Sequence, residues 1–336
     1  MTIRPTRGRI RENGLTTPQV LAIVGGIVVV GMIVLALVVK SAVSSALSGV
    51  DPSGLSEEVL GLDVELRELR HDHQTAIFLE ADEPKDPPTP PEGMFELVRY
   101  PAPLGENLAY VTPAGEEPGP AILWVIGGLW FGLEDTPWTY TDERNQQSAQ
   151  AFREAGITTM FASLRGTMGN PGNPECFFGE VDDLVAAGEW LAARPDVDPE
   201  RVYIGGHSSG GALVLLVAES TDLFAGAIAL GPVADPMSLG ERGCLPPDTS
   251  DLEAQVRAPI DWVSQIRIPT LIIEGTGGGG GRTLPLFEQE KGDAPVRVLG
   301  SPIDDHFTLI APVTRVAAAR IVDGRDPTEL TLAEIE

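Results

Sequence analysis

The stretch Arg201-Val-Tyr-Ile-Gly-Gly-His-Ser-Ser-Gly-Gly-Ala-Leu-Val-Leu-Leu-Val-Ala218 decides the fold of this 336-residue chain. Residues 201–205 form a short run that is typical of a buried strand, and residues 211–218 are apolar enough for a buried helix. Gly206-His207-Ser208-Ser209-Gly210 joins the two. Glycines around a serine let a strand and a helix approach closely without Cβ clashes. The sequence therefore predicts a strained turn that places Ser208 at the N-terminus of a helix, where free N–H groups favour negative charge.

Strands and helices alternate on both sides of this unit. The apolar strands lack a period of two, which is typical of a parallel sheet that is covered on both faces. We expect strands at residues 95–100, 108–111, 121–126, 157–164, 201–205, 226–230, 270–273 and 296–299, and helices at 142–155, 178–193, 211–218, 252–265, 285–291 and 307–322. The sequence therefore predicts an α/β fold with a mainly parallel, doubly wound sheet over residues 94–336.

A membrane anchor is expected ahead of this domain. Residues 20–39 form an uninterrupted run of 20 residues without a charge, which is long enough to span a bilayer. Five basic residues and one acidic residue lie in residues 1–40. The positive-inside rule therefore places the tail, residues 1–19, in the cytoplasm and everything after the anchor, residues 20–40, outside it. The alternative is a cleaved signal peptide, with Ser44-Ser45-Ala46 as a weak cleavage site.

Residues 41–93 are expected to form a stalk between the anchor and the domain. A helix-like stretch around residues 55–69 precedes Glu-Pro-Lys-Asp-Pro-Pro-Thr-Pro-Pro-Glu at 83–92. That proline run cannot sustain a helix or a sheet and is expected to be an extended spacer.

The charge of the chain excludes one class of partner, and its two cysteines raise the question of a disulfide. Beyond residue 40 the chain carries 18 basic and 48 acidic residues, a balance that repels nucleic acid, so no nucleic-acid partner is expected. Cys176 and Cys244 are the two cysteines, and both fall in loops at the carboxyl edge of the predicted sheet. Outside the cytoplasm they are able to pair and tie two loops together. Two unpaired residues are equally compatible with the sequence.

The Gly-x-Ser-x-Gly pattern between a strand and a helix is typical of the nucleophile elbow of serine hydrolases. A serine hydroxyl needs a base, usually histidine, and the chain has four histidines. His71 and His73 lie in the expected stalk, and the side chain of His207 should point away from Ser208. His306, between the last strand and the last helix, remains as the candidate base.

An oxyanion hole needs N–H donors in fixed positions. The residue after the nucleophile, Ser209, supplies one candidate N–H group. The second is expected from Ile126-Gly127-Gly128 after the strand at 121–126, and we select Gly128 because backbone that approaches a substrate favours the absence of a side chain.

With these residues in view, residues 94–323 resemble the catalytic domain of the prolyl oligopeptidase (S9) and dienelactone hydrolase group. The resemblance implies an α/β-hydrolase fold with Ser208 as nucleophile and His306 as base. It is carried by several motifs, namely Ile126-Gly-Gly128, Leu164-Arg165-Gly166, Gly179-Glu-Val-Asp-Asp183, Tyr203-Ile-Gly-Gly-His-Ser-Ser-Gly-Gly211 and Asp305-His306-Phe307.

The sequence departs from that group in three respects. No propeller domain precedes the core, and no tyrosine has a clear place near the oxyanion loop. The position expected to hold the catalytic aspartate is Gly278. Glu274, at the end of the strand at 270–273, is our first candidate for the acid, because a buried carboxylate needs a partner. Asp235, after the preceding strand, is the alternative.

Together these features predict a membrane-anchored serine hydrolase that acts outside the cytoplasm through an acyl-enzyme, with no metal or organic cofactor. The S9 likeness favours a short peptide as substrate, whereas the missing propeller and tyrosine favour a small ester. Two alternatives stay open. The missing aspartate suggests a catalytically inactive α/β-hydrolase-fold binding module, and an acyltransferase would use the same residues.

Overall fold

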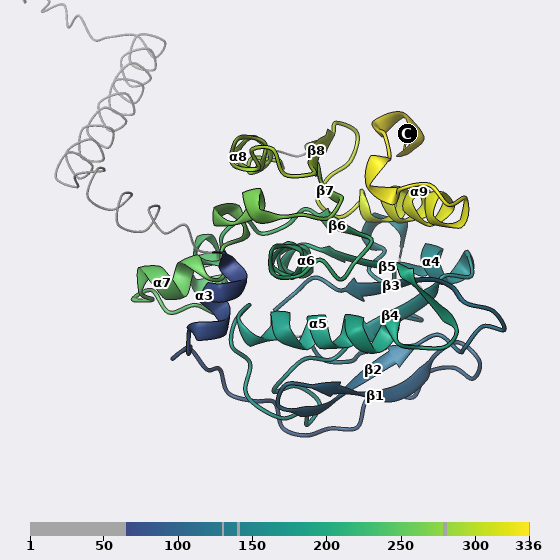
Figure 1. Ribbon diagram of the computed structural model, residues 1–336, viewed down its shortest axis with the longest axis horizontal. Coiled ribbons are helices and arrows are strands. Elements are labelled where there is room, and N and C mark those ends of the chain that lie inside the picture. Colours follow the sequence, from purple (N-terminus) through teal and green to yellow (C-terminus); the bar gives the residue numbers. More distant parts are fainter. Residues whose placement is uncertain (1–64, 130, 140–141, 278–280, 336) are drawn as a thin grey trace, which may run out of the picture. The chain divides into compact units, whose positions relative to one another are not determined.

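One sheet organises the part of the chain that the computed structural model describes, residues 65–129, 131–139, 142–277 and 281–335 (Figure 1). In these residues eight strands follow the order β1-β2-β4-β3-β5-β6-β7-β8. Strands β1 and β2 form an antiparallel hairpin, and β2 is antiparallel to β4. The other neighbouring strands in this order, from β4 through β3 to β8, pair in parallel. The strands are β1 (Glu96–Ala102), β2 (Gly105–Val111), β3 (Gly119–Val125), β4 (Thr158–Ala162), β5 (Val197–His207), β6 (Gly226–Leu230), β7 (Thr270–Gly275) and β8 (Val296–Ser301).

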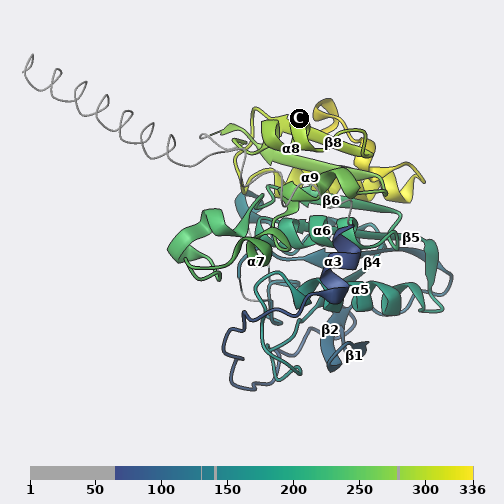
Figure 2. The same cartoon turned by 60° about the vertical axis from the view of Figure 1, so that its left-hand side comes forward.

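Helices cover both faces of the sheet, so the predicted doubly wound α/β fold is confirmed (Figures 1 and 2). Neighbouring strand residues alternate between two cores. In β3, Leu123 belongs to one core, and Ile122 and Trp124 belong to the other. The first core includes α3 (Leu66–Asp72), α5 (Gly179–Ala192), α6 (Ser209–Ser220) and α8 (Leu284–Glu290), and the second includes α4 (Gln150–Glu154), α9 (Ile310–Val322) and α10 (Leu332–Ile335).

Two expected helices are shorter than the sequence pattern suggests. The helix expected at residues 142–155 is reduced to a 3₁₀ turn, Glu143–Asn145, and α4. The helix expected at 252–265 is divided into α7 (Asp251–Gln255) and two 3₁₀ turns, Pro259–Asp261 and Val263–Gln265. Pro259 accounts for this break, because proline has no N–H group and cannot continue a helix from the preceding turn.

The described residues from 65 to 93 belong to the same compact unit as the domain that the sequence predicts from residue 94 onward. The run at 83–92 has neither helix nor strand, as expected, but the segment from 65 onward packs against the domain. Leu66 is fully buried, and the Arg70 guanidinium donates to the carbonyl groups of Phe178 and, at 3.0 Å, Val256. The N–H of Leu79 donates to the carbonyl of Pro174 at 2.8 Å. Extended backbone leaves its polar groups free for such bonds, and these bonds hold the segment on the domain.

The tail, the anchor and the cleavage site expected before residue 47 lie outside the described residues, as does Gly278. Within the described ranges, no helix combines the length and the apolar character that crossing a bilayer requires.

We predict that Leu66→Ala lowers the free energy of unfolding by roughly 2–5 kcal/mol, because it removes a fully buried side chain from the core. Phe78→Ala, in the same segment but at a side chain that is 56% exposed, should change it by less than about 0.5 kcal/mol. Denaturant unfolding of the two variants measures the difference. Equal stabilities would mean that residues 65–93 do not belong to the cooperative unit.

Candidate active site

The turn between β5 and α6 holds Ser208 in a conformation that is rare for a residue with a side chain, with φ 56° and ψ −120°. Two glycines make the turn possible. A Cβ on Gly206 would lie 2.7 Å from the carbonyl oxygen of Val125, and one on Gly210 would lie 2.3 Å from the same atom. The Ser208 N–H donates to the carbonyl of Leu230 at 2.8 Å. The backbone therefore fixes the position of Ser208 independently of its hydroxyl.

His306 and Glu274 lie side by side at the carboxyl edge of the sheet. His306 Nδ1 is 2.9 Å from Glu274 Oε2, and Glu274 Oε1 accepts the N–H of Gly275 at 2.7 Å. The Glu274 side chain is 11% exposed, compared with 33% for His306. Gly231, at the end of β6, approaches so closely that a Cβ there would lie 2.7 Å from both groups. An Nδ1–H donated to the carboxylate leaves Nε2 as the basic atom of a neutral ring.

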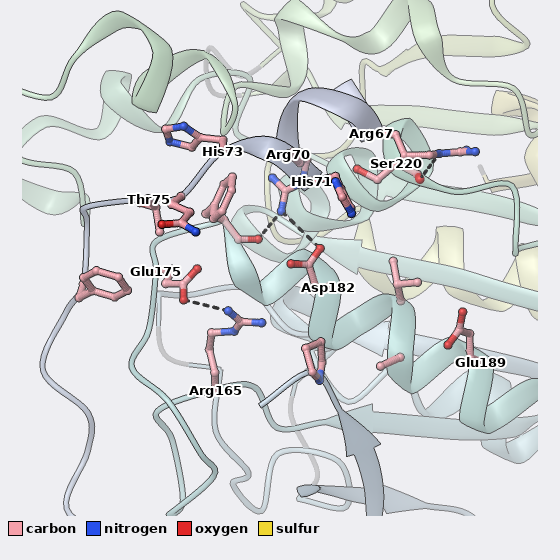
Figure 3. A pocket seen from close by; sticks show the side chains of 16 residues that line it. Arg67, Arg70, His71, His73, Thr75, Arg165, Glu175, Asp182, Glu189 and Ser220 are labelled. Atoms are coloured by element: carbon pink, nitrogen blue, oxygen red, sulfur yellow. Dashed lines mark hydrogen bonds and ion pairs between the residues drawn. The ribbon is translucent and has the colours of Figure 1, made fainter. Parts of the chain in front are cut away.

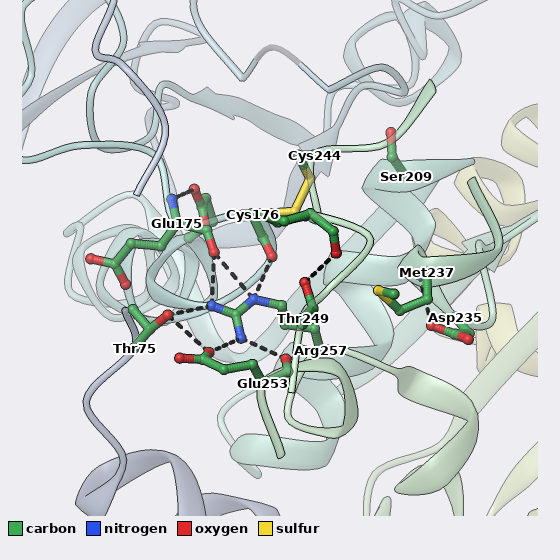
Figure 4. Close-up of a disulfide and its surroundings, with 12 residues drawn as sticks. Thr75, Glu175, Cys176, Ser209, Asp235, Met237, Cys244, Thr249, Glu253 and Arg257 are labelled. Carbon is green, nitrogen blue, oxygen red and sulfur yellow. Dashed lines mark hydrogen bonds and ion pairs between the residues drawn. A yellow bond between two sulfur atoms is a disulfide. The ribbon is translucent and has the colours of Figure 1, made fainter. Parts of the chain in front are cut away.

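The two other carboxylates near the predicted site have different partners. Asp235 caps the 3₁₀ turn Pro236–Arg242 and accepts the N–H of Met237 at 2.8 Å (Figure 4). Asp305 accepts the N–H groups of Phe307 and Thr308, each at 2.9 Å, and these bonds lower the pKa of its carboxyl group. The structure therefore places Glu274, and neither Asp235 nor Asp305, against the His306 ring.

His207 is a residue whose part in the site the sequence did not indicate. It is 1% exposed, and its Nε2–H donates to the backbone carbonyl of His306 at 2.8 Å. Its Nδ1 accepts the Nε2–H of Gln147 at 2.9 Å. Burial lowers the pKa of His207 to about 4, with a smaller contribution from the charge of His306, so the ring is neutral near pH 7. A neutral ring with this tautomer tethers the His306 loop to the elbow.

The two N–H groups expected to bind the oxyanion differ in their hydrogen bonding. The Ser209 N–H lies in the first turn of α6, where N–H groups have no acceptor within the helix. The Gly128 N–H instead donates to Ser209 Oγ at 2.7 Å, and that hydroxyl donates back to the Gly128 carbonyl. Gly127 is the closer neighbour of the nucleophile, since a Cβ there would lie 3.2 Å from Ser208 Cβ. The loop that is expected to supply an oxyanion donor is thus held against the elbow by the side chain of Ser209.

A disulfide joins Cys176 and Cys244, whose pairing the sequence left open (Figure 4). Their Cα atoms are 5.7 Å apart across a sequence separation of 68 residues. The bond connects the loop before α5 to the loop that follows β6. The buried guanidinium of Arg257 also holds the loop at Cys176, because its Nε–H donates to the Cys176 carbonyl at 2.9 Å. Two loops near the carboxyl edge of the sheet are therefore held at a fixed separation.

A cavity of about 770 Å³ lies away from these residues (Figure 3). It is lined mainly by α3, the segment after it and α5, and Ser208, His306 and Glu274 are not among its lining residues. His71 is exposed there, whereas His73 lies 3.3 Å from Glu253 and packs edge-on against Phe178. In the described residues no group of three or more His, Cys, Asp or Glu side chains could hold a metal ion.

Part of the chain is similar in sequence to known proteins. A model of the prolyl oligopeptidase family matches residues 144–255. The uncharacterized peptidase YtmA of Bacillus subtilis is 29% identical over 136 residues, which are 37% of this chain and 53% of that protein. An uncharacterized protein of Mycobacterium tuberculosis is 39% identical over 70 residues, which are 21% of this chain and 25% of that protein. The chain therefore spans about half or less of these curated relatives.

Solved structures show the same fold. The acylaminoacyl peptidase of Pyrococcus horikoshii has a TM-score of 0.55 and 15% identity, over 72% of this chain and 44% of that chain. A puromycin hydrolase has a TM-score of 0.51 and 18% identity, over 69% of this chain and 40% of that chain. The 2,6-dihydroxy-pseudo-oxynicotine hydrolase has the same score and identity, over 69% of each chain.

The predicted resemblance is therefore confirmed: residues 144–255 match the prolyl oligopeptidase family, and the domain has the α/β-hydrolase fold. The comparisons also support the prediction that the chain is an enzyme of the hydrolase class.

We predict that the stability contributed by His207 falls as the pH is lowered. The pKa of His207 is about 6.5 in the unfolded chain, whereas burial lowers it to about 4 in the folded chain. Between these two pH values the unfolded chain binds more protons, so lowering the pH destabilises the folded state. His207→Gln should reduce the loss of unfolding free energy between pH 7 and pH 5 by on the order of 1–2 kcal/mol. Denaturant titrations at both pH values measure it. The matched control is His71→Gln at an exposed site, and equal pH slopes for the two variants would contradict the prediction.

Proposed function

We propose that this protein is a serine hydrolase that forms an acyl-enzyme on Ser208, with His306 as general base and Glu274 as the acid that orients it. The observation that carries the proposal is the 2.9 Å contact between His306 Nδ1 and Glu274 Oε2, at the same sheet edge as a serine held at φ 56°. A serine in this strained turn together with a carboxylate-bound histidine fits nucleophilic acyl transfer.

Each residue has a distinct task in the proposed reaction. The Ser208 hydroxyl attacks the acyl carbonyl while His306 Nε2 takes its proton, and Glu274 holds the opposite side of the ring. The imidazolium then donates that proton to the leaving group, and water, activated by His306, hydrolyses the ester on Ser208. The Ser209 N–H stabilises the oxyanion. The Gly128 N–H contributes a second hydrogen bond to the oxyanion only if it releases the Ser209 hydroxyl and donates to the substrate oxygen instead.

The proposed substrate is a short peptide or a small ester. The names of two structural relatives, acylaminoacyl peptidase and puromycin hydrolase, favour amide substrates. The third, 2,6-dihydroxy-pseudo-oxynicotine hydrolase, favours a small molecule. Both classes present the acyl carbonyl that the proposed chemistry requires.

A fluorophosphonate probe and p-nitrophenyl butyrate test the proposal together. Wild type should be labelled and should hydrolyse the ester, and Ser208→Ala should do neither. Glu274→Gln should lower kcat roughly 10²–10⁴-fold, because the amide cannot stabilise the imidazolium, whereas Glu274→Asp should retain part of the rate. Asp235→Asn, which removes a carboxylate bonded elsewhere, is the matched control and should keep wild-type kcat. Folded wild type that is neither labelled nor active would support the inactive binding module instead.

We further propose that residues 20–40 anchor the protein in a membrane, with the hydrolase domain outside the cytoplasm. The uncharged 20-residue run and the basic residues before it support this location. The disulfide between Cys176 and Cys244 also supports it, because such bonds persist in oxidising compartments.

We predict that the expressed chain remains in the membrane pellet after alkaline carbonate extraction, whereas a chain that starts at residue 41 is released. Protease added to intact cells or spheroplasts should reach the domain. N-terminal sequencing separates an anchor from a signal peptide cleaved near Ala46. An intact chain recovered in the soluble fraction with two free thiols would contradict the anchored, extracytoplasmic location.

A further inference from the structure

The loop that carries His306 is bonded directly to the nucleophile elbow. This loop joins β8 to α9, and the Asp304 carbonyl within it accepts the N–H of Gly277, after the end of β7, at 2.8 Å. That bond holds the loop to its own side of the sheet. The Nε2–H of His207 instead donates to the carbonyl of His306 itself at 2.8 Å. Because His207 directly precedes Ser208, this second bond fixes the proposed base relative to the nucleophile.

A glutamine holds the other nitrogen of the His207 ring. Gln147, between the 3₁₀ turn Glu143–Asn145 and α4, places its Nε2 2.9 Å from His207 Nδ1. The same amide nitrogen donates to Asn145 Oδ1 at 2.9 Å, and the amide oxygen has no hydrogen-bond partner. The two hydrogens of the amide nitrogen therefore fix its orientation. With Nδ1 as an acceptor, the single proton of a neutral ring is on Nε2, where it faces the His306 carbonyl.

The orientation of the Gln147 amide decides the charge of the His207 ring. If the amide oxygen faced Nδ1, both ring nitrogens would have to be donors and the ring would be positively charged. His207 is 1% exposed, and burial lowers its pKa to about 4, with a smaller contribution from the charge of His306. A buried ring of this kind is neutral near pH 7, and the amide nitrogen of Gln147 is the group that matches it.

A charge on His207 would act directly on the proposed base. The centroids of the His207 and His306 rings are 4.5 Å apart. In the proposed reaction His306 becomes an imidazolium, which a second positive ring at this distance would oppose. Glu274, 2.9 Å from His306 Nδ1, supplies one negative charge, and two other neighbours of the His207 ring, Gly127 and Phe307, are uncharged. A neutral His207 therefore leaves the carboxylate of Glu274 to balance the imidazolium alone.

Resting on the function proposed above, we propose that Gln147 and His207 are positioning residues for the general base: Gln147 fixes the tautomer of His207, and His207 holds the His306 loop against the elbow. Neither residue exchanges a proton with the substrate in this scheme. Their loss should therefore act on the rate of proton transfer through the position and the charge of His306.

Two replacements of His207 in the full-length protein separate its hydrogen bond from its bulk. His207→Gln keeps an N–H donor close to the position of Nε2, whereas His207→Phe keeps a ring without a donor. With p-nitrophenyl butyrate, His207→Phe should lower kcat roughly 10–100-fold, because a small displacement of a catalytic group costs a factor of this order. His207→Gln should restore most of the rate. Equal kcat values for His207→Phe and wild type would overturn the proposal.

Gln147→Glu tests the role of the tautomer through charge. A carboxylate at this position accepts a proton from Nδ1 and raises the pKa of His207, so that the ring becomes charged at a higher pH. The pKa of His306 should then fall by about one unit or more, which moves the ascending limb of the kcat/KM profile to lower pH and lowers its plateau. Asn145→Asp adds the same charge at an exposed side chain bonded to Gln147, and should do neither. Identical profiles for these two variants would refute the role of Gln147.

Imidazole NMR decides the question without turnover. The chain has four histidines, so isotope-labelled histidine gives four ring signals, which are assigned by replacing each histidine in turn. In wild type, His207 should have a proton on Nε2 and none on Nδ1 between pH 8 and pH 6, whereas in Gln147→Glu it should have both. A wild-type His207 ring with its proton on Nδ1 would overturn the proposal. Should His207→Phe fail to fold, the half-buried Gln147 still provides this test.

The kinetic and NMR measurements separate a failure of this proposal from a failure of the proposed function. A wild type without Ser208-dependent turnover, but with the expected His207 tautomer and a lowered pKa of His306 in Gln147→Glu, would refute the proposed function and leave the positioning of the His306 loop standing. Ser208-dependent turnover that neither His207→Phe nor Gln147→Glu alters would refute the positioning pair alone.

Discussion

The close approach of the elbow to the end of β3 is the constraint on which the site depends. No side chain fits at position 210, because its Cβ would lie 2.3 Å from the Val125 carbonyl oxygen. The same contact brings the backbone after β3 against the elbow, where Gly127 faces Ser208 and Gly128 bonds Ser209. One backbone contact therefore positions both the serine and the loop that is expected to bind the oxyanion.

The remaining parts of the site follow from the parallel sheet. Strands β5, β6 and β7 all end at one edge, and each end contributes a different element: the elbow, Gly231 and Glu274. His306, in the loop after β8, reaches this edge and meets Glu274 where Gly231 leaves room for it. His207 ties the backbone of that loop to β5. Four segments distant in sequence are thus brought to one edge of the sheet because their strands are parallel neighbours.

Features encoded by short stretches of sequence were predictable, and features that depend on tertiary distance were not. The elbow, the strand sequence and the candidate base follow from local patterns of glycine, apolar residues and chain order. Pairing of Cys176 with Cys244 depends on a distance across 68 residues that no local pattern encodes. The proline run correctly indicated an extended chain. Its binding to the domain depends on a donor that the run itself does not reveal, the Tyr110 hydroxyl, which donates to the Pro88 carbonyl.

The loop at residues 163–178 explains why this fold retains so many buried charges. It has no regular secondary structure, and Cys176 and Phe177 adopt positive φ, so backbone ladders cannot hold it. Arg165 compensates by bonding Asp183 on α5 and Glu175 within the loop. Buried ion pairs add little net stability compared with apolar packing. Arg165, Asp183 and Glu175 therefore matter chiefly for geometry, because they fix the loop that supplies Cys176 to the disulfide.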